Sequence, residues 1–221
     1  MSKTYLVTSV LLDRIIGLVG LLLILGFGTL LNYSTLIELS EQMANLIHFN
    51  LLLFAGALGV LVFLFAPRKI QEQLLSLTNY IPVIGTKVHK TLESVWIIGD
   101  NKSVLFKCVT LSILLQFLNF AAFYLFSSPF FTKPFPFTYV LTLIPIGFMA
   151  VAVPISPAGL GVGHVIFDKL FGFVGISGGA NYFNLYFVGL VFINSFGIIP
   201  YLLSGKKHSL KEAEKFEENL T

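Results

Sequence analysis

The sequence predicts an all-α protein, a polytopic bundle of transmembrane helices. Hydrophobic residues make up 56% of the 221-residue chain and charged residues only 11%, whereas soluble domains carry about 25% charged residues. Apolar runs of about 20 residues, the length that crosses a bilayer as a helix, recur along the chain. These observations exclude a water-soluble domain. They predict one transmembrane domain over residues 1–205 and a charged cytoplasmic tail over residues 206–221.

Four segments are long and apolar enough to be full spans, which are Ile15–Tyr33, Leu46–Ala66, Ser103–Phe126 and Tyr182–Leu203. The second is followed by Pro67-Arg68-Lys69 and the last by Gly205-Lys206-Lys207, clusters that end apolar helices. The first span has an alternative start near Tyr5. That start would place Asp13 and Arg14 inside the helix, each in need of a partner, instead of at its beginning.

Residues 68–100 differ from the apolar spans because they mix apolar and polar residues at helical spacing. Ile70, Leu74 and Leu77 share one helical face, opposite Lys69 and Glu72. The pattern resumes after the Pro82–Gly85 break. We expect an amphipathic segment that lies on the membrane surface or caps the bundle.

Lysine and arginine residues predict the orientation. Residues 67–107 contain six of them and the tail after Leu203 contains four, whereas residues 34–45 contain none. The positive-inside rule therefore predicts that both termini and the amphipathic segment are cytoplasmic. The region 137–174 must then enter and leave the membrane on the outer side. We expect a broken or re-entrant pair, Phe137–Ile155 and Val162–Val174, with a full helical pair as the alternative.

The stretch VPISPAGLGVGHVIFDKLFG, residues 153–172, breaks this pair with prolines and glycines. A helix that begins near Gly161 would direct free N–H groups and its positive dipole end at the break, which suits an anion such as a lipid phosphate. His164 would lie in the first turn and Asp168 four residues later, on the same face. In the alternative interpretation the break serves packing only, and His164 and Asp168 satisfy each other.

No cofactor and no enzyme motif is expected. GLGVG lacks the spacing and the βαβ unit of a dinucleotide-binding fingerprint. His164 and Asp168 would supply only two metal ligands, and Ser156 has no recognisable base. Polar residues within the spans are expected to join helices or to line a translocation path; they are Gln116, Asn119, Asn184, Asn194 and Ser195. The pairs Gly17/Gly20 and Gly56/Gly59 predict close helix packing.

Two motifs carry a resemblance to a known family. PISPAGLGVGH resembles the signature of the lysylphosphatidylglycerol synthase/flippase membrane-domain family, and SVLLDRIIGL resembles an earlier motif with an acidic residue and an arginine. The resemblance implies a bundle with broken helices that moves aminoacylated phosphatidylglycerol or related lipids between leaflets. It also implies a substrate site that we list together with Asp168: Asp13, Arg14, Ser156, Pro157, Gly159, Gly161, Gly163, His164 and Asp168.

The chain departs from the family pattern in two respects. His164 stands where the family usually has glutamate, which favours a plain anionic lipid over a lysyl-lipid. The chain also lacks the family's first helices, so it would be a fragment, or a short member completed by a second copy or a partner subunit.

We therefore expect a lipid translocator of the bacterial inner membrane, not an enzyme, whose partner is a membrane phospholipid and not a nucleic acid. The alternatives are a membrane-embedded lipid-modifying enzyme, with His164 and Asp168 as acid and base, and a non-transporting subunit or remnant.

Overall fold

The computed structural model describes residues 3–78, 89, 92–93, 95–96, 101–152, 159 and 161–203. Every regular element in these ranges is helical, which confirms the predicted fold class. Four helical segments of the described chain are long and apolar enough to cross a membrane. They contain helices α1 (Lys3–Ile37), α2 (Glu41–Leu64), α5 (Lys102–Ser127) and α8 (Gly179–Ser195), the last continued by α9 (Ile198–Leu203).

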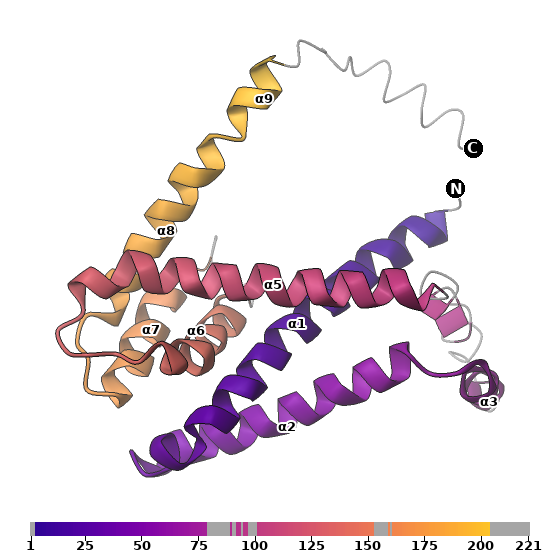
Figure 1. Ribbon diagram of the computed structural model, residues 1–221, viewed down its shortest axis with the longest axis horizontal. Helices are drawn as coiled ribbons and strands as arrows, with labels where there is room; N and C mark the ends of the chain where they lie inside the picture. Colours follow the sequence, from indigo (N-terminus) through magenta and orange to yellow (C-terminus); the bar gives the residue numbers. More distant parts are fainter. Residues whose placement is uncertain are drawn as a thin grey trace.

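Helix α1 is the centre of the bundle, because α2, α5 and α6 (Phe137–Val151) all pack against it (Figure 1). It begins at Lys3, ten residues before Asp13, or about 15 Å along the helix axis at 1.5 Å per residue. Asp13 and Arg14 therefore lie inside the helix, and where along this helix the membrane span begins stays a prediction.

Side-chain caps explain two helix starts. Ser40 precedes α2, and its hydroxyl accepts a hydrogen bond from the Met43 N–H at 3.1 Å. Asn101 does the same for α5, accepting from the Val104 N–H at 3.2 Å. These bonds satisfy N–H groups that the first turn of a helix leaves free.

The predicted amphipathic segment is described in part. Helix α3 (Arg68–Thr78) begins directly after Pro67 and lies at the end of α2, where Figure 1 shows it almost end-on. Further along, Trp96 is buried and its indole N–H donates to the Phe63 carbonyl at 3.2 Å. Lys102 donates to the neighbouring Leu64 carbonyl at 2.9 Å. Trp96 of the segment and Lys102 at the start of α5 thus bind carbonyls in the last turn of α2.

The pair α6 and α7 (Val162–Phe173) is short, with 15 and 12 residues, against about 20 for a full span. Near its start, α6 packs on the later part of α1, where Asn32 donates to the Thr138 carbonyl at 2.8 Å. Helix α7 packs on the early part of α8, where Gly163 lies against the Phe183 ring. A continuous helix through residues 153–172 is excluded, since α6 ends at Val151 and α7 begins at Val162.

The first half of α1 and the last part of α8 extend past this short pair. Residues 191–200 are all exposed, and Figure 1 shows the yellow α8–α9 arm and the indigo end of α1 leaving the bundle separately. The fold therefore has one densely packed end and one open end.

Aromatic side chains fill the packed end. Phe123 of α5 stacks on Phe167 of α7 at 5.2 Å between ring centroids, and Phe167 stacks on Phe183 of α8 at 5.1 Å. All three rings are buried. Gly147 of α6 lies against the Phe167 ring and has no room for a side chain, so this glycine lets α6 approach the aromatic cluster.

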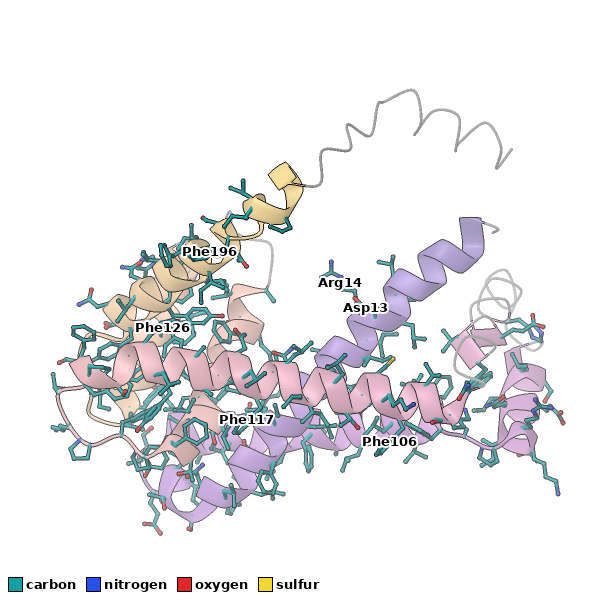
Figure 2. The ribbon with its side chains drawn as sticks, turned by 45° about the horizontal axis from the view of Figure 1, so that its top comes forward. Asp13, Arg14, Phe106, Phe117, Phe126 and Phe196 are labelled. Carbon is teal, nitrogen blue, oxygen red and sulfur yellow. The ribbon has the colours of Figure 1, made fainter. Side chains whose placement is uncertain are left out.

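The outer surface is apolar, as expected for contact with lipid. Val62 on α2, Phe106 on α5 and Phe192 on α8 are 73%, 63% and 65% exposed. Figure 2 shows Phe106 and Phe117 along the length of α5 and Phe196 on the arm. Isolated exposed apolar residues are common in soluble proteins, but continuous apolar faces on several long helices indicate a membrane environment.

Candidate functional site

A cavity of about 700 Å³ lies between α1, α5 and the end of α6. Small-molecule sites typically measure about 300–1,000 Å³. Its lining includes both charged residues of the first motif and the residue that directly precedes the second motif; among the lining residues are Asp13, Arg14, Gly17, Cys108, Ser112, Gln116 and Ala152. Most other lining residues are leucines, so the cavity combines apolar walls with a few polar groups.

Helices α1 and α5 are held together beside the cavity by side-chain to backbone hydrogen bonds. The Ser112 hydroxyl donates to the Ile16 carbonyl at 3.1 Å, and the Gln116 amide donates to the Gly17 carbonyl at a longer 3.4 Å. Gly20 lies against Ser112, and a Cβ there would collide with it. Gly17, by contrast, has no atom within 4 Å of where a Cβ would stand. The missing side chain at Gly17 therefore leaves part of the cavity open.

Asp13 and Arg14 are exposed, and neither has a hydrogen bond or ion pair with any residue that the structure describes. In Figure 2 both side chains point away from α1 toward the open side of the molecule. As consecutive residues they lie about 100° apart around the helix and do not face each other. Ionised side chains within a membrane span cost several kilocalories per mole unless water or a partner reaches them.

The second motif forms a glycine-based turn. Gly159 and Gly161 have φ values of 71° and 87°, in the left-handed region that glycine adopts without a steric cost. Gly159 also lies against the Val151 side chain, where a Cβ does not fit. This contact places Gly159 against the end of α6. Ser156 and Pro157 lie outside the described residues.

His164 uses both ring nitrogens within the protein. The Gly161 N–H donates to Nδ1 at 3.1 Å, so the proton of the neutral ring lies on Nε2, which donates to Asn184 Oδ1 at 2.6 Å. The ring thereby caps α7 and ties its first turn to α8. This is the neutral tautomer, as inferred from the hydrogen-bond network.

Asp168 is exposed and does not pair with His164, so the interpretation in which the two residues satisfy each other is wrong. Gly163 serves close packing against Phe183. The structure thus brings Asp13 and Arg14 to the cavity and Gly159 to the end of α6, whereas Gly163, His164 and Asp168 belong to the α7–α8 contact.

The polar residues within the spans mostly join helices, as predicted. Gln116 links α5 to α1, Asn119 of α5 accepts from the Tyr186 hydroxyl of α8, and Asn184 links α8 to α7. Ser195 bonds only within its own helix.

One such residue is absent from the predictions. The Asn32 amide, buried between α1 and α6, donates to the Gly28 carbonyl at 2.7 Å as well as to Thr138. Asn32 stands near the end of an apolar run, where a polar residue is typical of the end of a span. The sequence therefore did not indicate that its side chain joins two helices.

The close helix packing predicted at the two glycine pairs is found for one glycine of the α1 pair and for neither glycine of the α2 pair. Gly20 packs closely against α5, but Gly56 and Gly59 are exposed, and a Cβ added at either would meet no atom within 4 Å. Their spacing is typical of helix contacts, yet α2 meets α1 through another face, where Gly26 of α1 lies against Phe54.

Comparison with known proteins identifies the family. A family model described as "Lysylphosphatidylglycerol synthase TM region" matches residues 1–196. No curated protein and no solved structure matches the chain. Because the family model covers most of the 221 residues and both motifs, this chain belongs to the lysylphosphatidylglycerol synthase membrane-region family.

Proposed function

We propose that this chain is a lipid translocator of the bacterial inner membrane. It moves an anionic phospholipid or a related lipid between leaflets, with the headgroup held in the cavity beside Arg14. Translocation needs no covalent chemistry, so the proposal does not make the chain an enzyme.

One observation carries the proposal. Asp13-Arg14 and the proline-glycine motif are about 140 residues apart, yet a single cavity is lined by the charged pair and by Ala152, next to the second motif. Arginine suits a phosphate because its planar guanidinium forms two parallel hydrogen bonds. A headgroup there would give Arg14 the partner that the described residues do not supply.

The fold offers a route for the headgroup. If α1 and α8 cross the membrane, the shorter α6–α7 pair turns back within it as a re-entrant hairpin whose tip borders the cavity. Non-helical backbone at such a depth is tolerated where it lines a water-filled space. With both termini in the cytoplasm, the open end of the bundle faces the inner leaflet, and lipid tails remain in the bilayer beside the apolar outer helices.

The structure argues against acid–base catalysis by His164. A catalytic imidazole needs a nitrogen that reaches the substrate, and both His164 nitrogens are engaged by Gly161 and Asn184.

A role in assembly remains a second proposal, supported by a different surface. Gly56 and Gly59 lie on an exposed face of α2, and small residues let a second copy or a partner subunit approach closely.

The transport test compares two glycines that both have open space beside them. Gly17→Phe fills the cavity, whereas Gly172→Phe adds the same ring on an exposed surface of α7 that does not line it. We expect Gly17→Phe to slow the movement of fluorescent phosphatidylglycerol in reconstituted vesicles by about tenfold or more, because the ring occupies the headgroup space. Gly172→Phe should stay near the wild-type rate. Equal rates for all three proteins would reject the cavity as the route.

A further inference from the structure

The charges of the cavity point to a narrower class of ligand. We infer that it selects a zwitterionic phospholipid headgroup, one with a phosphate and a single ammonium group such as phosphoethanolamine, over a headgroup with a net negative charge. The inference rests on the proposed function and replaces the anionic lipid named there with a zwitterionic one. It starts from the groups that the cavity leaves free.

Two lining groups are already engaged. The Ser112 hydroxyl and the Gln116 amide both donate to carbonyls of α1. Among the described lining residues, Asp13 and Arg14 are the only charged ones, and both lack a partner in the described part of the chain. The cavity therefore presents one free carboxylate and one free guanidinium to a ligand.

Their spacing suits a short dipolar headgroup. Consecutive Cα atoms are about 3.8 Å apart, and the side chains diverge by about 100° around the helix. Both side chains line the same cavity, so one ligand can reach both charged groups. Such a headgroup can place its phosphate on Arg14 and its ammonium on Asp13 at the same time.

Charge balance then decides between headgroups. A zwitterion leaves no unpaired charge, since each group in the cavity meets one of opposite sign. A net anionic headgroup satisfies Arg14 but brings its negative charge beside the Asp13 carboxylate, and like charges close together in an apolar setting repel strongly. A headgroup with two ammonium groups leaves one of them without a partner.

In this arrangement His164 does not determine which headgroup charge is preferred. The sequence suggested that a histidine in place of glutamate would favour a plain anionic lipid. In the structure the His164 ring bonds to Gly161 and Asn184, so it does not present a free nitrogen to the headgroup. Asp13, which lines the cavity, is the residue that sets the charge preference.

The experiment measures the ratio of transport rates for labelled phosphatidylethanolamine and phosphatidylglycerol in the same vesicles. Wild-type protein should move phosphatidylethanolamine faster. Asp13→Asn keeps the size of the side chain and removes its charge, and should lower this ratio by about tenfold or more because the repulsion of the anionic lipid is lost. Glu38→Gln, which removes an acid outside the cavity at the other end of α1, should leave the ratio unchanged.

A binding measurement separates this inference from the proposed function. Short-chain phosphatidylethanolamine and phosphatidylglycerol are added to the detergent-solubilised chain, and the rise in unfolding temperature is compared. Asp13-dependent stabilisation by phosphatidylethanolamine, without transport of either lipid, would retain the headgroup preference and reject translocation. Transport with equal or greater preference for phosphatidylglycerol, unchanged in Asp13→Asn, would overturn the inference and retain translocation.

Discussion

The two ends of this bundle solve the problem of polar groups in a membrane in opposite ways. At the packed end, Asn32 and the His164–Asn184 pair bind partners on neighbouring helices. At the open end, Asp13 and Arg14 have no partner among the described residues and border a cavity. Paired groups hold helices together, whereas unpaired charges require water or a ligand. Under the proposed function, the packed end supports the structure and the open end binds the lipid headgroup.

We expect the largest effect from a substitution that disrupts the packed end where the backbones of α7 and α8 are in close contact. A side chain at Gly179 of α8 would collide with the Phe167 carbonyl and the Asp168 backbone, which cannot rotate away. We expect Gly179→Leu to prevent folding, measured as loss of monodisperse protein in detergent. Gly172→Leu, on an open surface of α7, is the control. A well-folded Gly179→Leu protein would mean that α7 and α8 do not pack this closely.

Removing one core ring should have the next largest effect. Phe123 is fully buried and contacts rings of α7 and α8, and Phe→Ala in a core typically costs about 3–5 kcal/mol. Phe123→Ala should therefore unfold at a much lower denaturant concentration. Phe192→Ala removes a ring of which 65% is exposed and should change the midpoint little. Similar losses for both variants would contradict the division into a packed and an open end.

Substitution within the Asp13-Arg14 pair distinguishes the open end from the packed end, because it should slow transport and leave stability unchanged. Arg14→Gln loses charge-assisted hydrogen bonds to phosphate, worth about 1.5–3 kcal/mol each, or roughly ten- to a hundredfold in rate. The unfolding midpoint should stay the same, since Arg14 is exposed and forms no hydrogen bond or ion pair with a described residue. Lys107→Gln removes a cation of α5 that does not line the cavity and should retain transport. A strong loss of stability in Arg14→Gln would assign this residue to the fold instead.

The smallest expected effect concerns the link between α7 and α8. Asn184→Ala removes the acceptor for His164 Nε2, and interhelical hydrogen bonds in membranes are worth about 0.6–2 kcal/mol. We expect a modest loss of thermal stability in detergent. Ser195→Ala, whose hydroxyl bonds only to its own helix, should be neutral. No difference between the two would mean that the histidine cap does not depend on α8.

Several features were predictable because they are local. Proline and glycine interrupt a helix wherever they occur, so the break before Val162 follows from residues 153–161 without reference to the rest of the chain. The same holds for the long apolar spans and for the helix ends near Pro67. The start of α1 was the exception, because charges at Asp13 and Arg14 suit either a helix boundary or a buried site.

Long-range contacts explain what could not be predicted. One of the two interpretations of the sequence gave His164 a partner four residues away, at Asp168, but the partner is Asn184, which no periodicity connects to it. Gly20 and Gly56 occur in similar patterns, but only Gly20 faces another helix of this chain. Which face of a helix is used depends on how the helices pack, and the local sequence does not specify this.

The sequence by itself determined that this chain lies in a membrane, where its helices run and where one of them is broken, because hydrophobicity and backbone conformation act on neighbouring residues. Only the tertiary structure decided that α6 ends beside Gly17, so that a cavity opens there and Arg14 borders the same space as the broken helix. The physical reason is close packing. Helices settle where their side chains interlock, and the space that remains between them depends on residues from every helix at once.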